Sequence, residues 1–83
     1  MYEYRKSRED ILDEDIQDFF EFCIIPAIIR RLHIAGFKKV YDVTLYSRRE
    51  IMLLKGVGKL TVDAIEFRLR EYDIVLKVEI DEL

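Results

Sequence analysis

Apolar positions recur at helical spacing near the start of the chain. Between residues 8 and 23 they fall three or four positions apart, with acidic residues between them: Leu12, Ile16, Phe19, Phe20 and Cys23. This spacing places them on one face of a helix. Ser7 can cap that helix, and Asp10 follows at the third helical position. The pattern predicts one acidic N-terminal helix within residues 1–23, with Cys23 as a buried structural thiol.

A second helix is predicted to begin at Pro26, because proline fits the first turn of a helix and disrupts an interior turn. Its apolar stripe consists of Ile25, Ile28, Ile29 and Leu32. Gly36 can end it in the left-handed conformation that glycine adopts readily. A short helical turn is expected around residues 39–45.

Two further helices are predicted around a pair of glycines. Ser47 and Glu50 match a capping box, so we expect a helix from Arg48 to Leu54. Gly56-Val57-Gly58 interrupts the pattern, and another helix is expected from Lys59 to Glu71. Residues 25–72 are therefore predicted to hold helices and no sheet.

The tail alternates partly like a strand from Ile74 to Ile80, without an evident partner strand. Its apolar residues would be exposed if the tail were free. We expect the tail to pack on the N-terminal helix or on a second copy of the chain, which would make a homo-oligomer.

Length and composition restrict the protein class. The chain has 83 residues, enough for one domain, and 51% of them are hydrophobic. No apolar run approaches the roughly 20 residues that cross a bilayer, and the first residues lack the apolar core of a signal peptide. One cysteine and one histidine allow neither an internal disulfide nor a zinc cluster. A cytoplasmic protein without membrane contact, metal or cofactor is expected.

Charge is distributed unevenly along the chain. Residues 1–23 hold three basic and eight acidic side chains, for a net charge of −5. Residues 24–70 hold ten basic and four acidic side chains (+6), and residues 71–83 hold one basic and five acidic (−4). The pairs Arg30-Arg31 and Lys38-Lys39 would each suit a solvated helix face, but together with Lys55 and Lys59 they favour a basic patch.

The glycine pair carries the clearest chemistry. Gly56 and Gly58 allow backbone angles that other residues resist, and they leave backbone N–H groups uncovered at the start of a helix, where the dipole favours an anion. Val57 would point inward and anchor the turn, while Lys55 and Lys59 add positive charge. A phosphate oxygen is a natural ligand for this arrangement, although the same turn also serves purely for packing.

The hairpin resembles the helix–hairpin–helix family of non-sequence-specific DNA-binding motifs. A longer stretch, residues 24–77, resembles the C-terminal domain of the bacterial RNA polymerase alpha subunit. The matching features, in chain order, are Leu32, Ala35-Gly36-Phe37, Val40-Tyr41-Asp42-Val43, Ser47 to Glu50, Gly58-Lys59, Val62, Ile65 and Ile74-Val75-Leu76. The resemblance implies an all-α fold, a compact bundle of about five short helices. Residues 1–23 are longer and more acidic than the family's lead-in, which indicates a stand-alone relative in a single domain with a tail at 78–83.

The resemblance also implies contact positions for DNA. Hairpin contacts would fall at Gly58, Leu60 and Thr61, and contacts of the first helix of the matching stretch at Ala27, Arg30 and His33. The family's groove-reading arginine is Ala27 here, an asparagine is Arg30, and a hairpin lysine is Leu60. Thr61 keeps the expected hydroxyl. Apart from this resemblance, His33 is more typical of a surface or half-buried histidine, with no evident carboxylate partner in the motif.

Two function classes follow. The first is a weak, non-sequence-specific DNA-binding module linked to transcription, with candidate residues Arg30, Arg31, His33, Lys55, Gly56, Gly58, Lys59 and Thr61. The second is a protein-interaction module that docks on RNA polymerase, a transcription factor or another protein without binding DNA. Enzymatic activity is not expected, because carboxylates such as Asp13 and Asp15 lie in a solvated acidic run and the domain is small.

Overall fold

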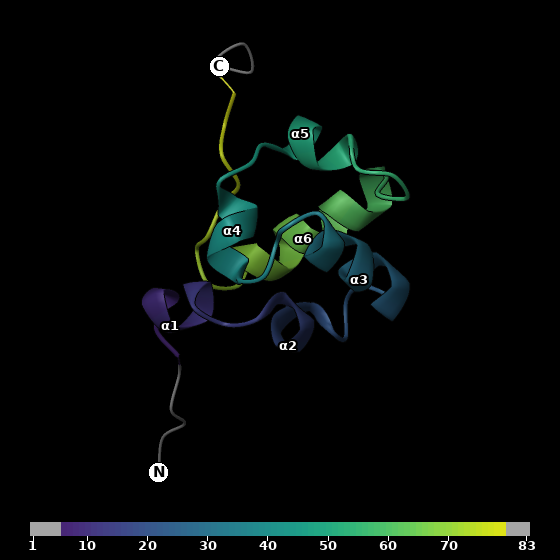
Figure 1. Cartoon of the computed structure of the whole chain (residues 1–83). Coiled ribbons are helices and arrows are strands. Elements are labelled where there is room, and N and C mark those ends of the chain that lie inside the picture. The colour runs from purple at the N-terminus through teal and green to yellow at the C-terminus, as the bar shows by residue number, and fades with distance from the viewer. Residues whose placement is uncertain (1–5, 80–83) are drawn as a thin grey trace.

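The computed structural model of the protein describes residues 6–79. This part of the chain holds helices and no strand (Figure 1). The helices are α1 (Arg8–Leu12), α2 (Ile16–Phe20), α3 (Pro26–Ile34), α4 (Val40–Thr44), α5 (Arg48–Met52) and α6 (Lys59–Arg70). The all-helical prediction is confirmed for these residues.

The last four helices form close to where the sequence predicts them. Pro26 occupies the first turn of α3, and Gly36 follows that helix with a φ of 105°. Ser47 caps α5, with its side chain accepting a hydrogen bond from the Glu50 N–H. Helix α5 ends at Met52, two residues earlier than predicted.

The N-terminal region contradicts the prediction of one acidic helix, because it forms α1 and α2 separately. The carboxylate of Asp15 accepts a hydrogen bond from the Gln17 N–H at 2.7 Å and caps α2. The link between the helices is also tied to the segment before α4: the Ile16 N–H donates to the Lys38 carbonyl at 3.0 Å, and the Val40 N–H donates to the Glu14 carbonyl at 2.9 Å. These pairings replace the bonds of a continuous helix and raise the helix number above five.

Cys23 is exposed, so its predicted burial is wrong. Helix α2 ends at Phe20, and the chain then turns, with the Cys23 N–H donating to the Phe20 carbonyl at 2.9 Å. After this turn Ile24, at 6% exposure, points into the core instead. The helical spacing that places Cys23 on the apolar face does not extend to that residue.

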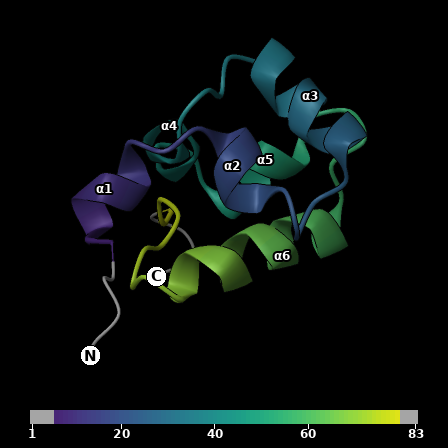
Figure 2. The ribbon, with the colours of Figure 1, turned by 90° about the horizontal axis from the view of Figure 1, so that it is seen from below.

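The buried apolar side chains form one cluster to which each of the six helices contributes. Helix α6 is the longest, and it buries Val62, Ile65 and Leu69. Figure 2 shows α6 along one side of the molecule, with α2 and α5 facing it. The guanidinium of Arg68 lies 4.3 Å from the centre of the Phe19 ring and donates to the Phe19 carbonyl, so it joins α6 to α2.

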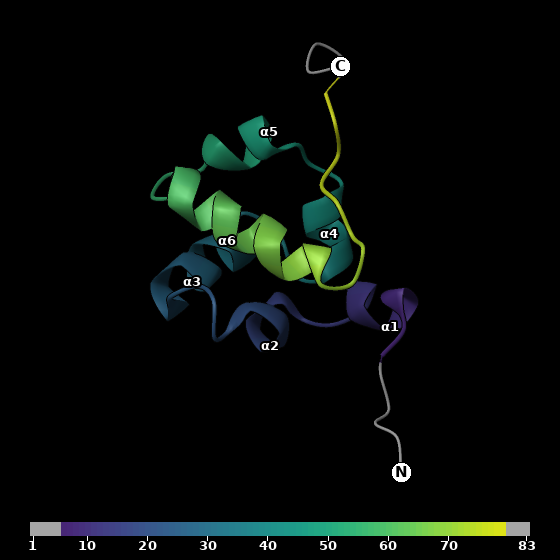
Figure 3. The same ribbon diagram turned by 180° about the vertical axis from the view of Figure 1, so that it is seen from behind.

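The tail folds back on its own chain after Asp73, whose φ of 58° ends the helical path. Ile74 and Leu76 are buried, and the Lys77 N–H donates to the Tyr46 carbonyl at 3.2 Å. Figure 3 shows the tail running past α4 towards the start of α5. This docking site was not among the predicted ones. Val75 and Val78 remain exposed, and Ile80 lies outside the described residues, so association of two copies through the tail stays a prediction.

Candidate nucleic-acid interface

The connection between α5 and α6 is a tight turn over residues 53–58. Gly56 has a φ of 83°, in the left-handed region that favours glycine, as predicted. Val57 is 5% exposed and its N–H donates to the Leu54 carbonyl at 3.1 Å, which confirms that it anchors the turn. Gly58 has an ordinary φ of −110°, so the predicted need for a special backbone angle is wrong there.

The start of α6 leaves backbone donors available. Gly58 occupies the N-cap position without a side-chain cap, and the first helical bond runs from the Val62 N–H to the Gly58 carbonyl. The N–H groups of Lys59, Leu60 and Thr61 precede that bond and have no partner within the helix. The first turn of α6 also contains no acidic residue. The positive end of its dipole is therefore not offset within the helix's own first turn.

Helix α3 begins in the same way beside the same surface. It has no side-chain cap and no acid in its first turn, whereas α1, α2, α4 and α5 each have an acid in the first turn. A surface hollow of about 370 Å³ lies between the two helix starts. Ile25 and Ile28 line it from the α3 side, and Gly56, Leu60 and Thr61 line it from the hairpin side. Two helix N-termini without acids in their first turns thus border one hollow.

Arg31 reaches from α3 to the hairpin. Its Nη1 donates to the Lys55 carbonyl at 3.4 Å. A Cβ atom built on Gly56 would lie 3.2 Å from Cδ and Nε of Arg31, so the guanidinium covers this glycine closely. Arg30 is exposed, as is Lys55. The structure therefore brings Arg31, Lys55 and Gly56 together, and Lys59 follows three residues after Gly56.

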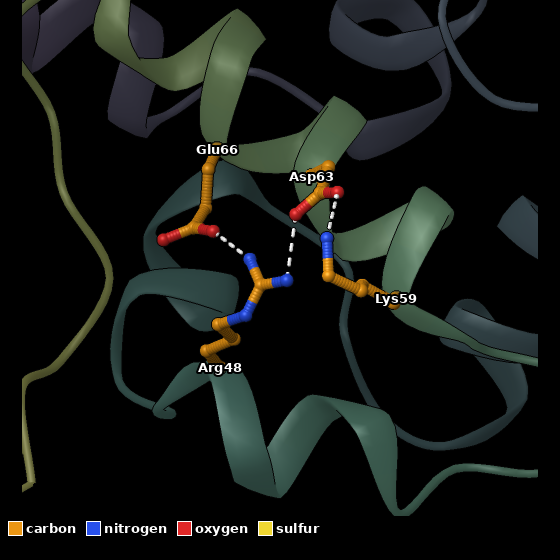
Figure 4. A network of polar contacts seen from close by, with 4 residues as sticks. All are labelled: Arg48, Lys59, Asp63 and Glu66. Carbon is orange, nitrogen blue, oxygen red and sulfur yellow. Dashed lines mark hydrogen bonds and ion pairs between the residues drawn. The ribbon is translucent and has the colours of Figure 1, made fainter.

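Lys59 shares its neighbourhood with a carboxylate. Its Nζ lies 3.1 Å from Asp63 Oδ2, while Nη2 of Arg48 lies 2.6 Å from Asp63 Oδ1 (Figure 4). Arg48 also pairs with Glu66, so one arginine of α5 bridges two acids of α6. Hydrogen bonds from Arg48 first and Lys59 second lower the pKa of Asp63. This network joins the start of α5 to α6.

Sequence reasoning missed the network because it considered Arg48 only as the first residue of a predicted helix. Asp63 and Glu66 stand three residues apart and so share a helix face, and Lys59 precedes Asp63 by four residues. Those spacings are the signal that could have identified the acidic half of the network. The arginine on the other helix has no such local signal.

The remaining basic residues lie elsewhere. His33 Nε2 is 3.3 Å from Asp15 Oδ1, a carboxylate partner that the N-terminal region supplies from outside the glycine motif. Lys39 pairs with Asp13 at 2.6 Å, and this hydrogen bond raises the pKa of Lys39. Figure 1 shows α1 and α4 together on the side opposite the hairpin. The expected patch that unites Lys38 and Lys39 with the hairpin lysines does not form.

Residues 6–79 contain no group of three or more potential metal-binding side chains. Over the same residues, no helix combines the length and the apolar character that crossing a bilayer requires. Comparison with models of protein families, with curated proteins and with solved structures finds no match to this chain.

Proposed function

We propose that the chain is a cytoplasmic module linked to transcription that binds duplex DNA weakly, without sequence specificity, through a helix–hairpin–helix formed by α5 and α6. One observation carries the proposal. The open, acid-free starts of α3 and α6 border one hollow, and Arg31, Lys55 and Lys59 lie beside the hairpin.

The chemistry suits a DNA phosphate. Its oxygens accept hydrogen bonds from the N–H groups of Lys59, Leu60 and Thr61, and the helix dipole favours their negative charge. Gly58 has no side chain to obstruct that approach, and the space beside it is open, because a Cβ there would meet nothing within 4 Å. Few phosphates fit one small domain, so the dissociation constant should be on the order of 10⁻⁴ to 10⁻⁶ M.

The absence of sequence specificity rests on the residue beside the start of α3. Ala27 is exposed, and its methyl group can form no hydrogen bond to a base edge. Arg31 is held against the turn rather than extended. Contacts to the phosphate backbone position a protein on DNA without reading sequence.

The test is titration of a labelled random-sequence duplex at about 50 mM and about 200 mM salt. Lys59→Glu should weaken binding to all sequences alike and lower the salt slope, because one phosphate contact is lost. Arg70→Glu is the matched control, because Arg70 is exposed at the other end of α6, about 16 Å away. It should leave the affinity nearly unchanged.

Two further readouts sharpen this test. Ala27→Arg should tighten binding, because it adds a cation beside the hollow. The amide signals of Gly56 and Gly58 should shift as the duplex is added. If neither signal moves while the domain stays folded, the DNA-binding proposal is wrong.

Docking on a protein is the second candidate, and one observation favours it. Leu60 is 83% exposed and Ile25 is 64% exposed, so the hollow beside the hairpin has an apolar rim that phosphate binding does not use. RNA polymerase or a transcription factor would be the partner. Binding to purified RNA polymerase, with no affinity for duplex DNA at low salt, would establish this function over the first.

A further inference from the structure

The end of α3 and the turn after α5 border a second hollow, of about 280 Å³. Arg31, Ile34 and Ala35 line it from α3, and Leu54 and Lys55 line it from the turn. None of these five residues lines the hollow between the starts of α3 and α6, so the two are separate. We call the second hollow, with its five lining residues, the basic hollow.

The two cations of the basic hollow have no acidic partner. Neither Arg31 nor Lys55 forms an ion pair within residues 6–79, whereas Lys39, Lys59 and Lys77 each pair with a carboxylate. The hollow has no acidic lining residue. The Arg31 guanidinium lies against the turn and donates to the Lys55 carbonyl at 3.4 Å. Two like charges therefore border one hollow without a counter-charge, and an anionic ligand would offset their repulsion.

The other lining residues of the basic hollow are apolar. Ile34 is 80% exposed, although it ends a helix whose other face is buried, and Leu54 is half-buried. Ile34 and Ala35 follow Arg31 by three and four positions, so a cation and two apolar side chains share one face of α3. A contact with DNA phosphates would leave Ile34 in water, whereas an apolar side chain of a protein would remove it from water.

We propose that the basic hollow binds an acidic amphipathic segment of another protein. An apolar side chain of that segment would fill the hollow against Ile34 and Leu54, and carboxylates one helical turn away would pair with Arg31 and Lys55. Residues three or four apart share a face, so one helix can present both. Charge selects this partner, because a basic segment meets repulsion at both cations and a neutral segment leaves both unpaired.

This inference goes beyond the proposed function, because it concerns a different hollow and a partner of another class. The two surfaces are nevertheless linked, since Arg31 and Lys55 are also candidate contacts for DNA. The acidic segment and duplex DNA should therefore compete for the protein. The binding of the segment itself is tested without nucleic acid, so the two proposals can fail independently.

The experiment is titration of the full chain with a fluorescent synthetic peptide that forms a helix with leucines on one face and glutamates beside them. A second peptide has lysine in place of each glutamate. Fluorescence anisotropy should show binding of the acidic peptide and none of the basic one. In the folded protein, the amide signals of Ala35, Leu54 and Lys55 should shift as the acidic peptide is added, whereas that of Val75 in the tail should not.

Lys55→Glu should raise the dissociation constant of the acidic peptide about tenfold, because it replaces an attraction with a repulsion. The hydrogen bond from Arg31 ends on the Lys55 backbone carbonyl, which this substitution retains. Arg70→Glu is the matched charge control, because Arg70 is exposed at the far end of α6 and has no ion pair within residues 6–79. It should leave the affinity nearly unchanged.

Ile34→Ser tests the apolar half of the proposal and should also weaken binding. The side chain is exposed, so the change should not unfold the domain. Val75→Ser is its control, because Val75 is 71% exposed and lies in the tail. It should have no effect on the affinity.

Three results would overturn the proposal. The first is equal affinity for the acidic and the basic peptide. The second is binding that Lys55→Glu and Ile34→Ser both leave intact. The third is a folded chain that the acidic peptide does not bind at millimolar concentration; if duplex DNA shifts the amide signals of Ala35 and Leu54 instead, the basic hollow belongs to the DNA-binding surface.

Discussion

The two ends of α5 use polar groups in opposite ways. At its start, the Ser47 hydroxyl is buried, accepts a hydrogen bond from the Glu50 N–H and donates one to Glu79 of the tail. The Lys77 ammonium lies 3.6 Å from Glu50. We call Ser47, Glu50, Lys77 and Glu79 the closed end.

After the C-terminus of α5 the chain enters the turn that leads to α6. We call Lys55, Gly56, Gly58 and Lys59, which lie in and after this turn, the open end. Lys55 and both glycines are exposed, and the side chain of Lys59 is 74% exposed. The backbone donors at the start of α6 have no helical partner. At the closed end the polar groups are used by the fold. At the open end Lys59 pairs with Asp63, but the backbone donors at the start of α6 are available to a ligand.

The comparison separates stability from binding. A change at the closed end should alter the free energy of unfolding and leave the affinity of the folded protein for a ligand intact. A change at the open end should alter the affinity for a ligand and leave the free energy of unfolding nearly intact. Gly56 is the exception among the open-end residues, because the turn requires its backbone conformation.

The largest expected effect comes from Leu76→Ala, beside the closed end. Leu76 is 5% exposed, and removing a buried leucine side chain costs about 2 to 4 kcal/mol through lost burial and the cavity it leaves. Urea denaturation measures this loss. Val75→Ala, at the exposed neighbouring position, should change stability by less than about 0.5 kcal/mol. Equal effects of the two changes would show that the tail is not docked.

Ser47→Ala should rank second, with a loss of about 2 kcal/mol, because it removes a helix cap and the bond to the tail together. Ser7 forms the same capping box at α1 but is exposed. Ser7→Ala should therefore cost less than about 1 kcal/mol. A comparison of thermal unfolding midpoints for the two variants checks the ranking, and a reversed order would contradict the special status of the closed end.

Gly56→Ala should cost about 1 to 2 kcal/mol, because alanine is strained at a φ of 83° and its Cβ would press on Arg31. Gly58→Ala should cost less, about 0.5 to 1 kcal/mol, because Gly58 has an ordinary φ and open space around it, so that only the preference for glycine over alanine at the N-cap is lost. Chemical denaturation distinguishes the two. If both variants lose the same amount of stability, the turn depends on Gly58 in a way that its geometry does not explain.

The smallest effect concerns pH. Hydrogen bonds from Arg48 and then Lys59 lower the pKa of Asp63, and the Ser47 N–H does so for Glu50. A carboxyl whose pKa is lower in the folded state stabilises the fold above its unfolded pKa, about 4, and loses this contribution as pH falls through the folded value. The melting temperature should therefore decrease below about pH 4. Asp63→Asn should remove part of that decrease, and an unchanged pH profile would count against the network in Figure 4.

Local chemistry explains why most helix positions could be predicted. Pro26 and Ser47 mark helix starts through rules that involve neighbouring residues only, and Gly36 marks an end in the same way. The turn between α5 and α6 was predictable for the same reason, including the inward position of Val57.

The sequence predictions are wrong where residues far apart in the sequence determine the local structure. The spacing of Leu12, Ile16 and Phe19 fits one continuous helix, but the Ile16 N–H bonds to Lys38, twenty-two positions away. Likewise Lys39 pairs with Asp13, so a basic pair that was assigned to a patch belongs to the opposite side of the molecule. A local pattern contains no information about such partners.

Within the candidate site, the sequence identified the turn but not its surroundings. Lys55, Gly56 and Lys59 lie within five consecutive residues, so the sequence alone places them close together. The packing of Arg31 on Gly56 and the bridge from Arg48 to Asp63 depend on how α3 and α5 meet the hairpin. Those contacts depend on tertiary packing, and no sequence motif indicates them.

The exposed position of Cys23 has a practical consequence. The chain contains one cysteine, and its thiol lies at the edge of the hollow that Leu60 and Ala64 also line. A maleimide fluorophore or spin label would therefore attach at a single known place in the unmutated protein. Its signal would report directly on whatever occupies that surface, and it would leave the hairpin residues unaltered.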